Sequence, residues 1–210
     1  MRLFWNYYFG VMVRPRRTFD ALTEDRQRLR FGLFALTISA ILYLFVYIFL
    51  TMAGGAPSVF TPFLAIPLDQ YYAYNRFFVL PSIFAGWILA AGVAQLLSRP
   101  FGGKGTFEDN LSVFGYAIGI AVLASLLHDL PDTFLGAIGV LDLKAYEVAL
   151  NSPTIWRTIL WICYGLSFVL FLVFFPKAVG AAQRIRSGPA LFVGILAFVT
   201  YQGFYLIFNR

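Results

Sequence analysis

Five long apolar runs constrain this chain more than any other feature. They cover approximately 31–53, 77–98, 110–127, 155–175 and 189–208. Each has about 20 residues, the length of helix that crosses a bilayer core of roughly 30 Å. Inside such a core every backbone N–H and C=O group must bond within the protein, and continuous runs without alternation exclude barrel strands. The sequence therefore predicts an all-α, polytopic integral membrane protein with five transmembrane helices.

The composition supports lipid as the main solvent of the chain. Hydrophobic residues make up 60% of the 210 residues and charged residues only 12%, about half the charged fraction of a soluble domain. No internal repeat or low-complexity run divides the sequence. We therefore expect a cytoplasmic basic segment, 1–30, followed by one transmembrane domain, 31–210.

The basic residues are distributed unevenly between the two sides of these runs. Twelve of the 16 lie before the first run, between the second and third, or between the fourth and fifth: Arg2, Arg14, Arg16, Arg17, Arg26, Arg28, Arg30, Arg99, Lys104, Lys177, Arg184 and Arg186. Positive residues are retained on the cytoplasmic side of a membrane. The pattern predicts a cytoplasmic N-terminus and an extracytoplasmic C-terminus.

The first 13 residues are apolar and aromatic but too short to span a bilayer. No small-residue cleavage site follows them, and the next arginines oppose translocation, so we do not interpret them as a signal peptide. We predict an interfacial helix on the cytoplasmic leaflet. Behind it, Arg14, Arg16 and Arg17 are candidate contacts to anionic lipid headgroups, and a protein-docking surface is the alternative use of the same residues.

A glycine-rich turn, Gly102 to Phe107, separates the second and third runs. Thr106 and Asp109 have the spacing of a capping box, which predicts a helix N-terminus directly after the turn. One interpretation is a tight reversal between two helices. The other is contact with a phosphate headgroup or a partner through Lys104 and Thr106. A nucleotide-binding P-loop is excluded, because Gly105 rather than Ser or Thr follows Lys104.

Small residues at helical spacing predict close packing of helices. Gly86 with Ala90 forms such a pair in the second run, and Gly115 with Gly119 forms one in the third. These pairs serve either packing within the bundle or a seam of a homo-oligomer. Because the turn between them is short, we expect the second and third helices to form a tight antiparallel pair.

Groups suited to catalysis or metal binding are scarce. No charged residue or histidine lies in the middle of any predicted run, which argues against a pump or a proton-coupled carrier. Polar residues within the runs are assigned to hydrogen bonds between helices, with a polar seam for lipid headgroups as the alternative. His128, Asp129 and Asp132 have metal-ligand chemistry, but Pro131 is expected to end the helix there. We predict no catalytic, cofactor-binding or metal-binding residue, and no enzyme.

Two motifs resemble those of a known family. The glycine-rich turn, followed by the residues Asn110 to Ala117, resembles the signature of the Yip (Ypt/Rab-GTPase-interacting protein) domain family, particularly its bacterial branch. The segment Pro15 to Leu22 is similar to that family's opening. The resemblance implies five membrane helices, a cytoplasmic N-terminus and, in a bacterium, location in the inner membrane. Its eukaryotic members are linked to membrane trafficking and small GTPases and carry longer cytosolic N-terminal regions.

Three classes of function follow from these features. The first is a non-enzymatic membrane organiser or adaptor that contacts lipid headgroups or a protein partner at the cytoplasmic face, as the resemblance implies. The second is a lipid-handling protein or small-solute transporter without charge coupling inside the membrane. The third, a membrane-embedded enzyme, lacks a constellation of catalytic residues. Nucleic acid is not an expected partner, since the pI of 9.6 follows from the excess of positive charge on the cytoplasmic side.

Overall fold

The computed structural model describes residues 2–57 and 63–209, and these residues contain helices but no strand. The elements are α1 Arg2–Val13, α2 Pro15–Thr23, α3 Arg28–Met52, η1 Leu68–Gln70, α4 Tyr71–Ser98, η2 Arg99–Phe101, α5 Phe107–Ala121, α6 Leu123–Ala137, α7 Leu143–Ala149, α8 Ile155–Gln183 and α9 Ser187–Asn209. In the described residues, α3, α4, α8 and α9 are each long and apolar enough to cross a membrane. The helices α5 and α6, bent by 46° at their junction, pass the same test together and add a fifth candidate span. The prediction of an all-α polytopic membrane protein is confirmed.

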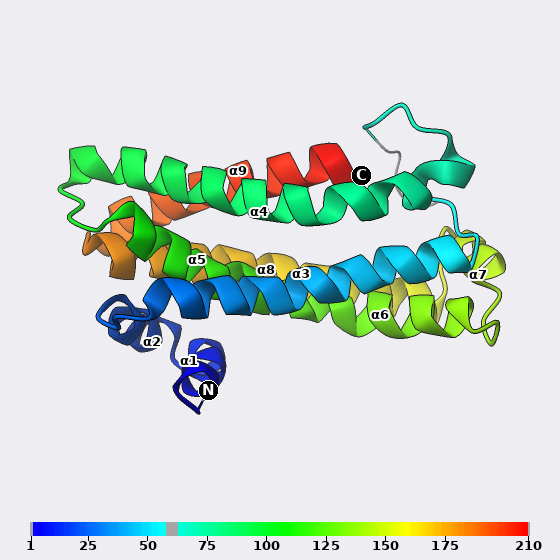
Figure 1. Cartoon of the computed structure of the whole chain (residues 1–210), viewed down its shortest axis with the longest axis horizontal. Coiled ribbons are helices and arrows are strands. Elements are labelled where there is room, and N and C mark those ends of the chain that lie inside the picture. The colour runs from blue at the N-terminus through cyan, green and yellow to red at the C-terminus, as the bar shows by residue number, and fades with distance from the viewer. Residues whose placement is uncertain (1, 58–62, 210) are drawn as a thin grey trace.

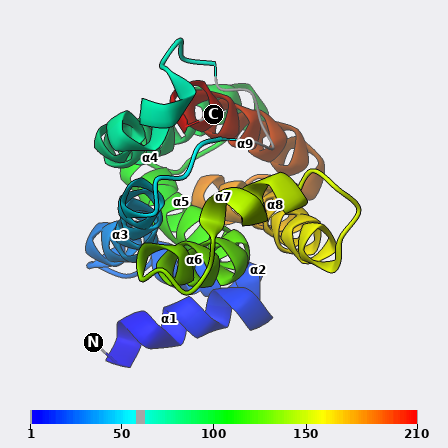
Figure 2. The same ribbon diagram turned by 90° about the vertical axis from the view of Figure 1, so that its right-hand side faces the viewer.

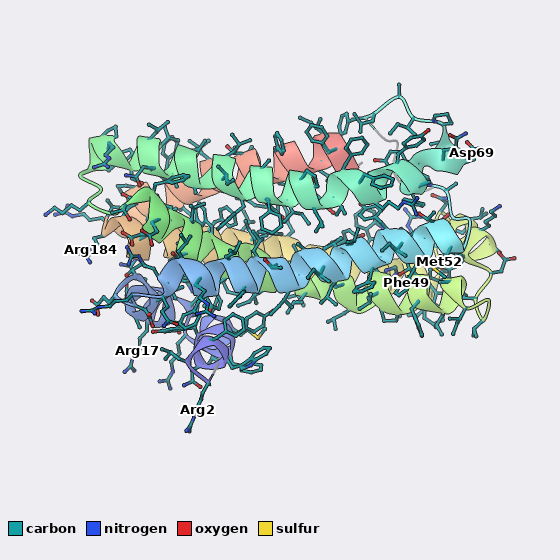
Figure 3. All side chains as sticks on the ribbon, in the orientation of Figure 1. Arg2, Arg17, Phe49, Met52, Asp69 and Arg184 are labelled. Carbon is teal, nitrogen blue, oxygen red and sulfur yellow. The ribbon has the colours of Figure 1, made fainter. Side chains whose placement is uncertain are left out.

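The long helices run along one common direction, and their connections gather at two ends (Figure 1). At one end lie α2, the turn between α4 and α5, and the turn between α8 and α9. We call it the basic end, defined by the exposed side chains of Arg14, Arg17, Lys104, Arg184 and Arg186. At the other, the α7 end, lie α7 and the last residues of α3, whereas α9 stops short of this end. Figure 3 shows Arg17 and Arg184 at the basic end and Met52 and Asp69 at the opposite end.

Close contacts of small residues decide which helices pair. Gly115 of α5 lies against the backbone of Gly32 in α3, and Gly86 of α4 lies against Tyr201 in α9. The closest partners are thus α3 with α5 and α4 with α9. The expectation that the second and third helices form the tight pair is therefore wrong, because the glycine-rich turn connects two helices whose small-residue faces point to other neighbours.

Two prolines lie inside helices, and one of them, Pro131, was expected to end its helix. Pro131 lies within α6 and Pro176 within α8. A proline removes a single backbone hydrogen bond, and neighbouring helices hold the two flanks in place. At the start of α8 the cap is Thr154, whose side chain accepts a hydrogen bond from the N–H of Arg157. The capping box at the start of α5 is confirmed.

The first helix, α1, lies across the side of the bundle (Figure 2), near the basic end (Figure 1). It buries Phe4 and Tyr8 against the bundle, where the Phe4 ring lies 5.8 Å from that of Tyr116 in α5. The hydroxyl of Tyr7 donates a hydrogen bond of 3.0 Å to Asp25. Burial, with help from this bond, raises the pKa of Tyr7 to about 12. The opposite face of α1 exposes apolar side chains, namely Leu3, Trp5, Phe9, Met12 and Val13.

Candidate functional site

The glycine-rich turn at the basic end packs against the end of α8. Gly102 adopts a φ of 79°, which glycine reaches without strain. A Cβ atom at Gly105 would overlap the carbonyl group of Ala182. The backbone N–H of Lys104 donates a hydrogen bond of 3.1 Å to the carbonyl of Gln183. The turn is therefore fixed by backbone contacts, and the side chain of Lys104 is exposed above it.

A buried amide network lies directly beneath this turn. The Nε2 group of Gln95 donates to the carbonyl of Gly105 at 3.0 Å. Its Oε1 atom accepts hydrogen bonds from Asn110 at 2.8 Å and from Gln183 at 2.9 Å. One glutamine thus joins α4, the turn, α5 and α8, and positions Lys104 relative to three helices. The sequence placed Gln95 in a span but gave no sign of these partners.

The side chain of Thr106 is used in the cap of α5. Its hydroxyl oxygen accepts the N–H of Asp109 at 3.1 Å, and the Asp109 carboxylate accepts the N–H of Thr106 at 2.8 Å. The Nε atom of Arg28 lies 2.6 Å from the same carboxylate, which ties the start of α3 to the start of α5. Arg28 is therefore engaged in an ion pair between helices.

The three arginines of the N-terminal segment differ in their surroundings. Arg16 pairs with Asp20 at 3.2 Å, and its guanidinium group lies against Gly180 of α8. Arg14 and Arg17 are exposed, and neither forms an ion pair with any described residue. The structure therefore leaves Arg14, Arg17 and Lys104 as cations at the basic end that have no acidic partner within the described chain.

A cavity of about 730 Å³ lies toward the α7 end, between α3, α4, α5, α6, α7, α8 and α9. Its volume falls within the range of about 300–1,000 Å³ typical of small-molecule sites. Toward the middle of the bundle its wall is mostly apolar, with a few hydroxyl groups, and the apolar residues there include Leu36, Ala40, Ile83, Ile118, Val122 and Phe171. Toward the α7 end the wall carries its titratable groups, namely His128, Asp129, Asp132 and Glu147, beside further apolar residues. The titratable groups of the cavity thus gather at one end of a mostly apolar wall.

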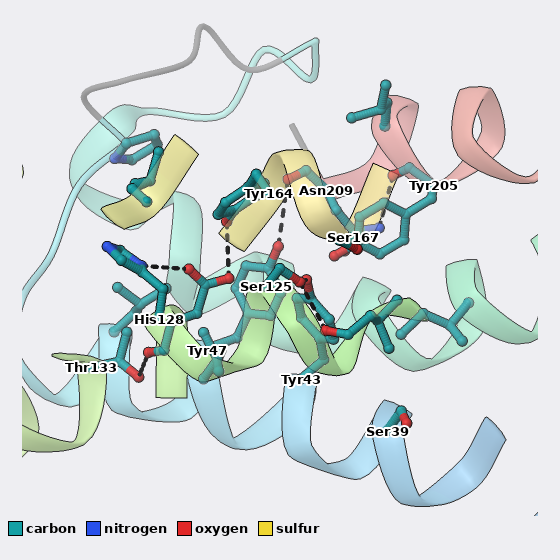
Figure 4. Close-up of a pocket in the computed structure, with 18 of the residues that line it drawn as sticks. Ser39, Tyr43, Tyr47, Ser125, His128, Thr133, Tyr164, Ser167, Tyr205 and Asn209 are labelled. Carbon is teal, nitrogen blue, oxygen red and sulfur yellow. Dashed lines mark hydrogen bonds and ion pairs between the residues drawn. The ribbon is translucent and has the colours of Figure 1, made fainter. Parts of the chain in front are cut away.

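A cluster around His128 forms the polar part of the wall (Figure 4). The Nδ1 atom of His128 lies 3.0 Å from Asp129, and its Nε2 atom lies 3.2 Å from Asp132. The hydroxyl of Tyr146 on α7 donates to Asp132 at 2.8 Å, and that of Tyr164 on α8 donates to Asp129 at 2.9 Å. Three helices therefore converge on two carboxylates and one imidazole.

The interpretation of this cluster as a capped helix end is wrong. Because α6 continues through Pro131 to Ala137, His128 and Asp132 lie one turn apart on the same helical face. The third run was also expected to end at residue 127, with no titratable group inside it. If α5 and α6 cross the membrane as one bent span, His128 and its two carboxylates belong to that span. Among the described residues, no group of three or more His, Cys, Asp or Glu side chains is arranged to hold a metal ion.

Polar residues from the apolar runs bond between helices and also line the cavity. The hydroxyls of Tyr43 and Ser125 lie 2.7 Å apart, and Ser39 donates to the carbonyl of Gly119 at 2.5 Å. Ser167 donates to the carbonyl of Ala121 at 2.8 Å. The hydroxyl-bearing members of these pairs lie along the cavity wall. These residues therefore form the hydrogen bonds between helices that the sequence assigned to them, and they also lie on the cavity wall.

Glu147 of α7 closes the cavity at its α7 end. Its Oε2 atom accepts a hydrogen bond of 3.1 Å from the N–H of Ala56, in the segment after α3. Burial raises the pKa of Glu147 to about 7, opposed in part by this bond. Burial also raises the pKa of the neighbouring Tyr146, with the carboxylate of Asp132 as a further cause. The site therefore includes a carboxyl group that titrates near neutral pH.

The sequence matches one protein-family model. Residues 9–208, nearly the whole chain, match the Yip1 domain. The chain belongs to the Yip1 domain family. This confirms the resemblance found in the glycine-rich turn and the N-terminal segment, both of which lie within the matched range. No curated protein and no solved structure matches the chain.

The protein is therefore a membrane protein of the Yip1 domain family. Several of its helices are long and apolar enough to cross a bilayer. The matched range contains the unpaired cations of the basic end and the whole polar cluster of the cavity. The cations of the basic end could be identified from the positions of Arg and Lys in the sequence. The cavity could not be identified in this way, because the cluster around His128 forms only when α6, α7 and α8 come together. The one available signal was the spacing of four residues between His128 and Asp132.

Proposed function

We propose that this Yip1 domain protein is a non-enzymatic membrane organiser whose basic end binds anionic lipid headgroups at the cytoplasmic face. The observation that carries the proposal is the pair of exposed, unpaired arginines, Arg14 and Arg17, directly after the apolar outer face of α1. An apolar helix face beside cations is the arrangement that binds an anionic membrane surface. Lys104, whose backbone is held in place by the turn, is a further exposed cation at the same end.

The proposal assigns no catalytic residue. Both ring nitrogens of His128 are occupied by carboxylates, and no Ser or Cys side chain among the described residues is bonded to it. The proposed location is the inner membrane of a bacterium, with the basic end and the N-terminus in the cytoplasm and the C-terminus outside. This orientation rests on the excess of positive residues at the basic end.

Charge reversal at the basic end tests the proposal. In Arg14→Glu/Arg17→Glu/Lys104→Glu we expect purified protein to retain several-fold less phosphatidylglycerol, measured by native mass spectrometry, with zwitterionic lipid unchanged. The matched control is Lys144→Glu/Arg157→Glu at the α7 end, which is expected to retain wild-type amounts. If the triple variant keeps its anionic lipid and instead loses a co-purifying protein, the basic end serves as a protein adaptor.

A second function, lipid handling or transport of a small solute, is favoured by the amphiphilic cavity. A cavity with an apolar wall and a polar end suits a lipid whose headgroup lies at the α7 end. In proteoliposomes we expect the wild-type protein to accelerate exchange of a labelled lipid between leaflets, and Ala40→Phe, which fills the apolar part, to slow it. Exchange at the rate of protein-free vesicles would count against this function.

A further inference from the structure

We propose that the cavity binds the ammonium headgroup of a membrane amphiphile beside Asp129 and Asp132, with its acyl chain along the apolar wall toward the middle of the bundle. The inference rests on the second proposed function, since it names the headgroup class of the molecule that the cavity would hold. It is independent of the basic end, which lies at the opposite end of the bundle.

The charge of the cavity selects a cation. Asp129, Asp132 and Glu147 line it, and no Lys or Arg is among the described residues of its wall. With both carboxylates ionised, the cluster of Asp129, Asp132 and His128 keeps one net negative charge even when His128 is protonated. A buried carboxylate is costly unless a partner compensates it. A ligand that brings a positive group supplies the missing charge, whereas an anionic headgroup adds to the repulsion.

The aromatic side chains around the cluster also favour an ammonium ion. Tyr146 and Tyr164 hold the two carboxylates through their hydroxyls, and both residues line the cavity, with the Tyr146 ring stacked on that of His128. Trp161 of α8 also lines this part of the cavity. Aromatic rings attract cations through their faces, most strongly where water is excluded. Carboxylates and rings together favour an ammonium group over a neutral, sugar-like headgroup.

An unpaired acceptor lies on another wall of the cavity. Asn209 of α9 is 5% exposed, and its Nδ2 group donates to Ser82 at 2.6 Å and to the carbonyl of Tyr205 at 2.9 Å. Its Oδ1 atom has no hydrogen-bond partner among the described residues. A buried amide oxygen is seldom left without a donor.

The length and opening of the cavity fit an acyl chain. Its lining on α3 extends from Leu36 to Leu50, which corresponds to roughly 21 Å along the helix axis. Trp161 and Phe168 of α8 are about half exposed and still line the cavity. Leu206 of α9 lines the cavity beside them.

The decisive test compares headgroups on one acyl chain. The full-length protein in a neutral detergent is titrated with lysophosphatidylethanolamine and with lysophosphatidylglycerol, and binding is followed by native mass spectrometry. We expect the amine lipid to bind at least about tenfold more tightly, a difference of roughly 1.4 kcal/mol. Dodecyltrimethylammonium forms a third arm. If it binds as tightly as the amine lipid, an ammonium group alone suffices, and if only the amine lipid binds, a phospholipid is the source.

Substitutions locate the binding. Asp129→Asn/Asp132→Asn is expected to lower affinity for the amine lipid about tenfold and to leave lysophosphatidylglycerol unchanged. Asp69→Asn, an exposed carboxylate at the same end and outside the cavity, is the matched control. Ala40→Phe is expected to lower the affinity for both lipids, because it occupies the chain-binding part.

The two proposals fail in different ways. Equal binding of the two headgroups to the wild-type protein overturns the inference about the ammonium group, and lipid handling stands if Ala40→Phe still weakens both. If neither lipid binds, or if Ala40→Phe leaves both affinities unchanged, lipid handling in this cavity fails as well. Since the headgroup comparison uses the wild-type protein, it holds even where a variant does not fold.

Discussion

The carbonyl group of Gly32 on α3 occupies the position that a side chain on Gly115 of α5 would need. One turn further along α5, a Cβ atom at Gly119 would lie 2.5 Å from the carbonyl oxygen of Ala35. Backbone therefore packs on backbone along this interface, which is the closest approach that two helices can make. The same interface holds the hydrogen bond from Ser39 to Gly119 and so fixes one wall of the cavity.

Replacing Gly115 is expected to separate these two helices. Gly115→Ala places a methyl group against backbone that cannot move aside, so we expect a loss of about 2 kcal/mol in the free energy of unfolding. The measurement is thermal or denaturant unfolding in detergent. Gly203→Ala on α9, where no atom lies within 4 Å of the added carbon, is the control and is expected to be neutral or slightly stabilising. Equal stability of the two variants would contradict the packing described above.

The cap of α5 gives a second prediction. Thr106→Ala removes the acceptor for the N–H of Asp109 and is expected to cost about 1 kcal/mol of stability. Thr106→Ser keeps the acceptor and serves as the matched control. Lys104→Ala is expected to leave stability unchanged, because only the backbone of Lys104 takes part in the turn. A larger effect at Lys104 than at Thr106 would show that the lysine side chain, rather than the cap, holds the turn.

Glu147 makes stability depend on pH. Its pKa is raised from 4.5 to about 7 in the folded protein, so the folded state binds more protons than the unfolded state between these values. The free energy of unfolding that this difference contributes is therefore fully present below about pH 4.5. It is lost as the pH rises through 7, by roughly 3 kcal/mol in total. Glu147→Gln is expected to remove this loss.

The measurement is the free energy of unfolding of both proteins between pH 5 and pH 8. We expect the wild-type protein to lose stability relative to Glu147→Gln across this interval, and the difference isolates Glu147 from other groups that titrate there. A difference that is constant with pH, or one that changes in the opposite direction, would mean that Glu147 is ionised in the folded protein throughout.

The orientation in the membrane gives a fourth prediction. In a Cys163→Ala background, Asp69→Cys at the α7 end is expected to react with a membrane-impermeant maleimide added to intact cells. Arg184→Cys at the basic end is expected to react only after the membrane is permeabilised. The reverse pattern would place the basic end outside and would remove the proposed contact with the cytoplasmic leaflet.

Several features could be predicted from the sequence because their causes are local. Apolar runs of sufficient length require helices in a bilayer, and the spacing of Thr106 and Asp109 predicts a cap that depends on four consecutive residues. The end of the third helix could not be predicted in this way. Pro131 normally ends a helix, but α6 is held on both sides of it by neighbours that are distant in sequence.

Sequence alone thus determined the all-helical membrane class, the family and the end of the bundle that carries the cations. Only the tertiary structure decided that α3 packs on α5, that α4 packs on α9, and that His128, Asp129 and Asp132 meet Tyr146 and Tyr164 at a cavity. The physical reason is that lipid is as apolar as a helix interface. A membrane helix therefore carries no hydrophobic stripe that marks its inward face, and its partners follow from close packing and buried hydrogen bonds between distant segments.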